Sequence, residues 1–577
     1  MQIDRIKTWI SRPGFHLIFL WVAPLAFLGL FYFFPLWKII ILSFGRVENG
    51  FSNAIQELLT SHSIHQVFWF TVWQAILSTI LTLVIGLPGA YLIARFQFRG
   101  KSLLLALSGI PFVMPTLVVA AAFNAFLGPQ GWINLVLIKF FDLSTPPIHF
   151  TNTLFAILIA HVFYNTTIVL RMVGDFWSHL DPHLTQVAHT LGANRWYTFT
   201  KVLFPLLIPS IAAASLLVFI FDFTSFGVIL ILGGPRFATL EVEIYYQTIS
   251  LFNLPLAATL ALLQLLCTLG ITIVYTRLSS RLTQPLYLKS RVYTQERLIG
   301  WRSRIFATII VSFLILLLVT PLVSLAVRSF TSLGMGRIQT GDPPPGLTLD
   351  YYRELSINRQ SSLFYVPPTK AIIISLGYAI ATVILAIALG FPAAWALARY
   401  SHAHINRLLD PILMLPIGTS AVTLGLGFIV ALNRPPLDLR ASPWLVPIAH
   451  TLVAFPFVVR SLTPALRSIQ PRLRYAAAML GASSGSIVRF IELPLVGRSL
   501  LVAATFAFAI SLGEFGATAL IARPEYPTVP LVIYRYLSLP GNLNYGQALA
   551  LSTILMAVCA VGILTIERFR IGGIGEF

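Results

Sequence analysis

Four ionisable side chains stand out because they lie inside long apolar stretches. Asp222 occurs in "FDFTSFG" and Glu514 in "SLGEFGAT", while His161 and His450 lie in separate apolar runs. A carboxylate is costly inside a membrane and by default marks a pathway. For both acidic residues, a pathway role and a structural role (a buried interhelical hydrogen bond or a helix-start contact) remain open. Histidine can ligate metal or relay protons. No repeated carboxylate lies near the two histidines in the sequence, so we expect packing hydrogen bonds there and no metal site.

An internal duplication relates these residues to one another. When the first half is shifted by 289 positions (481 − 192), "AHVFYNTTIVLR" from Ala160 aligns with "AHTLVAFPFVVR" from Ala449, and no gap is needed as far as Tyr245. Upstream the match continues at another offset, with "GLPGAYLIAR" from Gly86 over "GFPAAWALAR" from Gly390. The duplication therefore predicts two halves of similar structure.

The acidic residues are not equivalent in this duplication. Asp222 aligns with Ser511, whereas Glu514 aligns with Ser225. The two positions are one helical turn apart, so we expect a mixed patch of carboxyl and hydroxyl groups that faces the axis between the halves. Asn165, which has no polar counterpart in the second half, is a further candidate for the pathway.

These residues must be positioned by membrane helices. The 577 residues are 57% hydrophobic and 10% charged, against about 25% charged in soluble proteins. The apolar runs approach the ~20 residues of a spanning helix and lack the alternation of a β-barrel. We predict an all-α polytopic membrane protein with two parallel six-helix repeats. The twelve spans are expected near 16–42, 67–93, 103–127, 149–170, 207–232, 256–276, 304–327, 371–398, 408–432, 444–463, 496–521 and 545–566.

The charge pattern predicts the orientation in a bacterial plasma membrane. The net charge is +19, and Lys and Arg concentrate in alternate loops, which places both termini in the cytoplasm. The sequence contains no basic patch with interleaved aromatic residues, so we do not expect nucleic-acid binding. We expect a first repeat at residues 1–280, a basic cytoplasmic linker at 281–303 and a second repeat at 304–577. An even number of spans in each half relates the halves by a pseudo-twofold axis along the membrane normal.

One long segment between spans occurs in both halves, at residues 181–205 and 470–494; we call these the paired segments. They read "DPHLTQVAHTLGANRWYTFTKVLFP" and "QPRLRYAAAMLGASSGSIVRFIELP". A Pro precedes helix-forming residues, and Gly192 or Gly481 then ends that helix in a left-handed conformation or lets another backbone approach. A second helical piece is expected to stop at Pro205 or Pro494. Interfacial helices without a partner are the alternative.

The paired segments resemble the EAA loop of binding-protein-dependent ABC importer permeases, with pattern E-A-A-x3-G-x9-I-x-L-P. The leading Glu is absent from both copies. The matching positions are Gln186, Val187, Ala188, Gly192, Val202, Phe204 and Pro205 in the first half, and Tyr475, Ala476, Ala477, Gly481, Ile491, Leu493 and Pro494 in the second. The resemblance implies a coupling helix in each half that docks on an ATP-hydrolysing subunit. The ATPase-coupling residues would be Gln186, Ala188, Gly192, Pro205, Ala476, Ala477, Gly481 and Pro494.

The resemblance also implies the partners. They are an ABC ATPase present in two copies, an extracytoplasmic solute-binding protein and the lipid bilayer. A P-loop needs G-x4-G-K-[ST], and "RFQFRGKS" has Arg95 in place of the first Gly. We therefore expect a transport subunit that is not itself an enzyme, binds no cofactor and relies on a partner to hydrolyse ATP.

The transported solute is predicted by resemblance alone. "SFGVILILGGPRFATLEVEIYYQ" resembles fused permeases for thiamine and iron(III), whereas "GEFGATALIARPEYPTVPLVIY" resembles permeases for molybdate and sulfate. We expect iron(III) or thiamine. The alternatives are molybdate, sulfate or polyamine within the same class, and an ion-coupled secondary transporter with parallel repeats.

Overall fold

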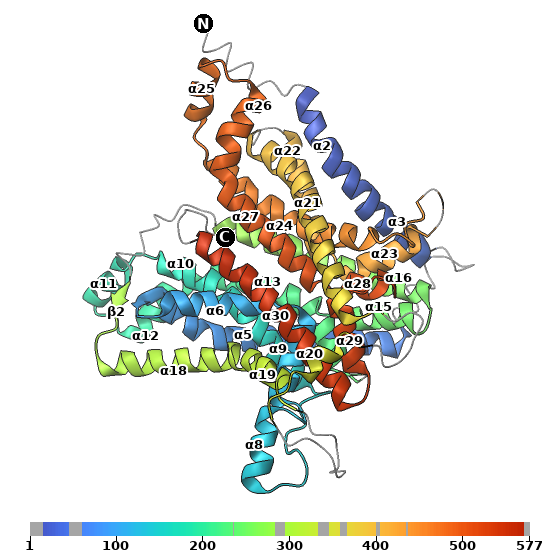
Figure 1. Ribbon diagram of the computed structural model, residues 1–577. Helices are drawn as coiled ribbons and strands as arrows, with labels where there is room; N and C mark the ends of the chain where they lie inside the picture. The colour runs from blue at the N-terminus through green and yellow to red at the C-terminus, as the bar shows by residue number, and fades with distance from the viewer. Residues whose placement is uncertain are drawn as a thin grey trace.

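The computed structural model describes residues 15–44, 60–234, 236–282, 295–332, 346–357, 366–399, 404–433, 435 and 437–570. Helices make up nearly all of its regular structure (Figure 1). Eleven helical stretches in the described residues are long and apolar enough to cross a membrane, and a bent helix pair raises the number to twelve. The prediction of about twelve membrane helices is confirmed.

The first half runs from the first span to the sixth. Its elements are α2 (Phe15–Leu28), α3 (Phe34–Phe44), α5 (His62–Arg95), α6 (Lys101–Val113), α7 (Thr116–Leu127), α8 (Trp132–Phe141), α9 (Leu154–Ile168), α10 (Gly174–Ser178), α11 (His183–Thr190), α12 (Arg195–Thr198), α13 (Phe204–Phe223), α14 (Gly227–Leu232), α15 (Leu240–Ile249) and α16 (Leu254–Leu282). Short π-helical turns join α2 to α3, α9 to α10 and α12 to α13.

The second half has a similar order of helices, without a counterpart to α8 among its described residues. Its elements are α18 (Trp301–Leu318), α19 (Thr320–Ser329), α20 (Asp350–Glu354), α21 (Pro368–Arg399), α22 (His404–Met414), α23 (Ala421–Ala431), α24 (Leu445–Ser468), α25 (Pro471–Met479), α26 (Ser484–Ile487), α27 (Leu493–Gly513), α28 (Gly516–Ile521), α29 (Val529–Ser538) and α30 (Asn542–Arg570). A π-helical turn, Val488–Glu492, joins α26 to α27.

The third and ninth spans are each divided in two. The third span divides into α6 and α7, with Pro115 at the start of α7. In the ninth, the stretches Leu409–Gly418 and Ala421–Ala431 meet at 98°. Proline lacks the N–H that would continue the helical hydrogen bonds. In the ninth span, Pro416 lies in the short turn Leu415–Gly418, just before the bend. The fifth and eleventh spans are also divided, between α13 and α14 and between α27 and α28.

Matching close contacts show that the halves pack alike. A Cβ added to Gly86 would lie 2.8 Å from Val169, and one added to Gly390 would lie 2.7 Å from Val458. These four residues are equivalent under the two sequence offsets. In both halves, therefore, the second and fourth spans approach so closely that only glycine fits at the crossing.

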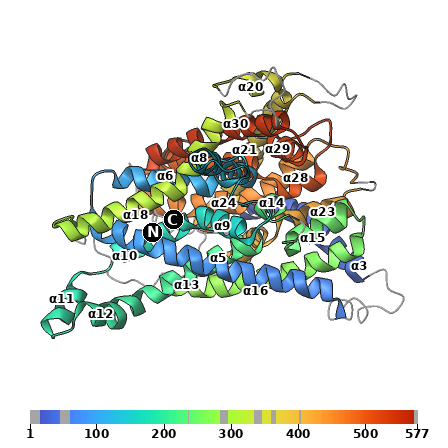
Figure 2. The same cartoon turned by 90° about the horizontal axis from the view of Figure 1, so that it is seen from below.

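The first span of each half packs against the other half. Helix α2 lies along α21 and α3 along α23, while α18 and α19 lie along α5 and α7. Figure 1 shows α2 beside the second half, and Figure 2 shows α18 beside α6 of the first half. The halves are therefore interlocked rather than merely adjacent.

The predicted linker joins the first half through a short strand pair. Strand β1 (Phe96–Gln97) pairs in parallel with β2 (Glu296–Arg297). Arg95 and Glu296 form an ion pair at 3.9 Å. The loop after the second span is thus tied to the chain that leads into the second half.

Candidate functional site

The first paired segment contains α11 and α12, with Gly192 between them. Gly192 has φ +85°, and the Ala193 N–H donates to the Ala188 carbonyl at 3.0 Å while the Gly192 N–H donates to the His189 carbonyl at 3.0 Å. This is a Schellman motif, in which a left-handed glycine closes a helix. The Asn194 side chain then accepts a hydrogen bond from the Tyr197 N–H at 2.7 Å and begins α12.

The second paired segment has the same geometry. Gly481 has φ +84°, and the Ala482 N–H donates to the Ala477 carbonyl at 3.0 Å while the Gly481 N–H donates to the Ala478 carbonyl at 3.0 Å. A Cβ added to Gly192 or Gly481 would meet no atom within 4 Å. Of the two roles expected for these glycines, the structure therefore supports the left-handed helix end.

The second helical piece of each segment does not stop at proline, so that prediction is wrong. It continues through a π-helical turn into the fifth or eleventh span, as stretches 195–223 and 485–513. Pro205 and Pro494 lie in the first turn of α13 and α27. A π-helical turn widens the helix locally, and a proline in the first turn needs no N–H partner. Each paired segment is thus continuous with a spanning helix.

The surface of both segments exposes apolar side chains at equivalent positions. Leu191 is 82% exposed and Leu480 is 89% exposed. Of the predicted coupling residues, Ala188 is buried and Ala477 is half-buried. The exposed ones are Gln186, Gly192, Pro205, Ala476, Gly481 and Pro494. Large exposed apolar groups at the end of a helix are typical of a contact surface.

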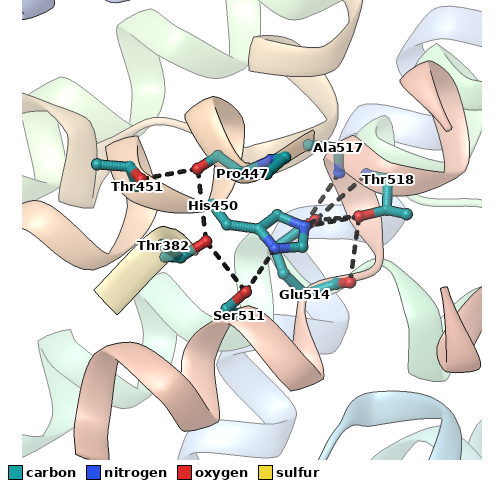
Figure 3. A network of polar contacts seen from close by, with 8 residues as sticks. All are labelled: Thr382, Pro447, His450, Thr451, Ser511, Glu514, Ala517 and Thr518. Carbon is teal, nitrogen blue, oxygen red and sulfur yellow. Dashed lines mark hydrogen bonds and ion pairs between the residues drawn. The ribbon is translucent and has the colours of Figure 1, made fainter. Parts of the chain in front are cut away.

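The pathway candidates of the second half lie around His450 (Figure 3). His450 Nδ1 lies 2.8 Å from Ser511 Oγ, and its Nε2 lies 2.8 Å from Thr518 Oγ1 and 3.4 Å from the Glu514 carboxylate. Glu514 also accepts hydrogen bonds from the Ala517 and Thr518 N–H groups at 3.0 and 3.2 Å. It therefore caps the start of α28 and links the tenth and eleventh spans.

The first half has the equivalent cluster around His161, with the acid and the hydroxyl exchanged. His161 Nε2 lies 2.9 Å from Ser225 Oγ, and its Nδ1 lies 3.4 Å from Asp222 Oδ1 and 3.0 Å from Ser78 Oγ. Asn165 donates to Asp222 at 2.7 Å. The sequence suggested no carboxylate for either histidine, yet each histidine meets one from the following span.

These contacts define where the pathway candidates lie. Asp222, Ser511, Glu514 and Asn165 are buried, and Ser225 is half-buried. The structure groups them as one histidine-centred cluster in each half, between neighbouring spans. The helix-start contact considered for Glu514 and the interhelical hydrogen bond considered for Asp222 are both present.

Four aromatic residues mark the axis between the halves. Phe226 and Phe515 stack with ring centroids 5.4 Å apart and an interplanar angle of 21°. They are equivalent under the 289-residue offset, and a residue can contact its own symmetry mate only at the axis. Tyr245 packs on Phe226 and Tyr534, its equivalent, on Phe515, at 5.3 and 5.5 Å. We call these four residues the axial aromatic cluster.

The close fit of this cluster depends on Gly227. A Cβ there would lie 2.3 Å from Thr116 Oγ1 and 3.3 Å from the Phe515 ring. Phe226 and Phe515 are 6% and 3% exposed, so the rings fill the axis at this level. The cluster lies beyond the ends of α13 and α27 that are farther from the paired segments.

Sequence reasoning missed one buried carboxylate that joins the halves. Glu241 in α15 accepts from Ser420 Oγ at 2.5 Å and from Gln264 Nε2 at 2.6 Å. It lies outside the candidate spans, and burial raises its pKa to about 8 because a desolvated carboxylate is disfavoured. The sequence did carry a signal for this site, because Glu241 lies in a mostly apolar stretch between two spans.

Comparison with known proteins identifies the family. Residues 83–284 and 386–571 each match the binding-protein-dependent transport system inner membrane component. The thiamine transport system permease protein ThiP of Escherichia coli K12 is 27% identical over 516 residues, which cover 86% of this chain and 88% of the relative. The ThiP protein of Salmonella typhimurium is 26% identical over 90% of this chain and 92% of its own length. A probable ABC transporter permease protein, y4fN, of Sinorhizobium fredii is 26% identical over 90% of each chain.

The family matches coincide with the duplicated halves, and each includes one paired segment. This assignment decides against an ion-coupled secondary transporter. The chain belongs to the binding-protein-dependent inner membrane components of ABC importers, with two copies of the family unit fused in one multi-pass polypeptide.

Proposed function

We propose that this protein is the fused permease of a thiamine importer. Two copies of a separate ATPase dock on the paired segments, at the coupling residues predicted above, and a binding protein delivers the solute at the opposite face. Both termini and the linker lie on the cytoplasmic side. The chain itself hydrolyses no ATP and holds no cofactor. Two observations support the proposal. Both halves match the family, and relatives named thiamine transport permeases align with this chain over most of their length.

The pathway we infer runs along the axis between the halves. The orientation predicted from the charges puts the axial aromatic cluster on the outer side, at the ends of the fifth and eleventh spans. The helices diverge from this region toward the paired segments, which lie at the left and the top of Figure 1. This arrangement corresponds to an outer gate that is closed. ATP-driven approach of the paired segments would move α13 and α27 and part the rings.

The cluster is also chemically suited to the solute. Thiamine carries a permanent positive charge on an aromatic ring system, and aromatic faces attract such cations. Glu514 directly precedes Phe515 in the chain and accepts hydrogen bonds from two backbone N–H groups, so a carboxyl-bearing residue lies next to the cluster. A hydrated iron(III) ion would gain nothing from phenylalanine, and the named relatives support thiamine and not iron.

The test is assembly and uptake with the neighbouring partners. The chain is purified with the ATPase and binding protein encoded beside it, and proteoliposomes are supplied with labelled thiamine, iron(III), molybdate, sulfate or a polyamine. Gly192→Arg and Gly481→Arg are expected to prevent ATPase co-elution. Gly100→Arg is the control, since Gly100 also has a left-handed φ and open space around it but lies outside the paired segments. Co-elution of the ATPase with both docking variants would refute docking at the paired segments. ATP-dependent uptake of another solute, without thiamine uptake, would refute thiamine as the substrate.

A further inference from the structure

The buried carboxylate of Glu492 lies at the base of the second paired segment. It is 0% exposed and is the last residue of the π-helical turn before α27. Its two oxygens accept hydrogen bonds from Arg474 Nε and Trp395 Nε1, both at 2.5 Å. The Arg399 guanidinium lies 3.8 Å away. We call these four residues the Glu492 junction.

The junction joins the paired segment to several spans. Arg474 belongs to α25 and also donates to the Leu466 carbonyl of α24 at 3.4 Å. Trp395 and Arg399 belong to the last turns of α21, with the Arg399 guanidinium 4.8 Å from the Trp395 ring centroid. A buried ion pair is costly to break, because one charge is then left without a partner. Helix α25 is therefore held by charge to α21, α24 and α27.

The first half has no such ionic junction among its described residues. The sequence offsets place Thr185 at the position of Arg474 and Leu203 at the position of Glu492. Tyr91 takes the place of Trp395 and packs on Trp177 at 5.2 Å, and Trp177 lies 6.3 Å from Phe199. Arg95, which takes the place of Arg399, pairs instead with Glu296, so the contact between the first paired segment and these spans is apolar.

The two joints differ in how directional their contacts are. Apolar attraction is non-directional, whereas charge-assisted hydrogen bonds fix the relative orientation of their partners. In the second segment, the exposed position of α25 where the family motif has Glu is occupied by Tyr475. The carboxylate of this segment is that of Glu492, which is buried in the π-helical turn before α27. Its acidic group therefore faces the spans and not a docking partner.

We propose that Glu492 is a positioning residue that makes α25 move as one body with the eighth, tenth and eleventh spans. ATPase movement then reaches the second half rigidly and the first half through a more compliant joint. This inference rests on the proposed docking of an ATPase at α25. Removal of the charge would leave docking possible but weaken the transfer of movement.

The first experiment needs no partner and so tests the junction by itself. Hydrogen–deuterium exchange is measured on the purified full chain and on Glu492→Leu combined with Arg474→Thr, which installs the first-half residues at both positions, while Arg399 keeps its contact with the Trp395 ring. Amides of α25 are expected to exchange about tenfold faster or more, while those of α11 stay unchanged. Glu296→Gln, which removes an exposed ion pair to Arg95, is the control and should leave both helices unaltered. Unchanged exchange in α25 overturns the proposal.

The second experiment measures coupling in the reconstituted complex. Glu492→Gln and the double variant are expected to co-elute with the ATPase and hydrolyse ATP, but thiamine uptake per ATP should fall about fivefold or more. An unchanged ratio refutes the positioning role. Failure of the unaltered chain to bind the ATPase would instead refute the proposed function, and the exchange result on the isolated chain would still stand.

Discussion

The stacked pair of Phe226 and Phe515 provides a direct test of the axial pathway. We consider Phe226→Ala, Phe515→Ala and the double variant, each made in the full chain. If both rings lie on the axis and close the outer gate, their loss should weaken closure. The two single variants should also not be independent, because each removes the same contact.

The magnitude follows from the geometry. Rings stacked at 5.4 Å and 21° are worth about 0.5–1.5 kcal/mol beyond the area that they bury. Each single truncation also loses packing worth about 3–5 kcal/mol, but a double-mutant cycle cancels that contribution. A coupling of this size changes the ratio of closed to open gate by about 2- to 12-fold.

Two assays report these quantities. Thermal unfolding of the four proteins gives the coupling energy, and passive thiamine entry into proteoliposomes without ATP gives the leak. We expect a coupling of about 1 kcal/mol and a leak that rises in the single variants and does not double again in the combined one.

Phe219 and Phe223 supply a matched control. Their rings stack at 5.8 Å and 26°, but both belong to α13 and do not cross the axis. Phe219→Ala should alter stability without a leak. The reasoning is refuted if Phe226 and Phe515 show no coupling, or if Phe219→Ala leaks to the same extent.

Three further predictions concern single positions. Gly481→Ala should weaken ATPase binding, because an L-residue in left-handed conformation costs about 1–2 kcal/mol; titration of the ATPase measures this, and Gly485→Ala should bind normally. Gly390→Ala should lower the thermal midpoint, since a Cβ would lie 2.7 Å from a valine methyl and such overpacking costs about 1–3 kcal/mol; Gly377→Ala, on the same helix with open space around it, should not. Glu514→Gln should reduce uptake in a complex that still assembles, because two backbone N–H bonds to a charge become neutral at a loss of about 2 kcal/mol; unchanged uptake would remove Glu514 from the pathway.

The sequence predicted the backbone best where a residue type strongly favours one conformation, as glycine does in the left-handed turn that ends a helix. Gly192 and Gly481 recur at matched spacing after a helix-forming run, and their left-handed φ values of +85° and +84° follow from that pattern. Hydropathy also located the spans, because burial in lipid requires long apolar helices whatever their rotation.

The contacts between spans could not be predicted from the sequence. Most faces of a membrane helix are apolar, so periodicity does not reveal which side meets a neighbour. His450 and Ser511 are 61 residues apart, and their contact depends on helix depth and rotation. The breaks in the third and ninth spans lie inside mostly apolar runs, where Pro115, Pro416 and the helix-capping Ser420 were the local signals. Glu492 was overlooked because it lies between two positions of a recognised motif.

The stacking of Phe226 on Phe515 has an implication for the history of the chain. A residue that touches its own counterpart suggests an ancestor in which two identical copies of one half met across a true twofold axis. In such a homodimer every substitution appears twice, so an acid on one side and a hydroxyl on the other cannot arise. Duplication of the gene removed that constraint, because each half then has its own codons. The exchanged positions of Asp222 and Glu514, and a charged joint in the second half alone, are divergence that two separately encoded halves permit and two identical copies do not.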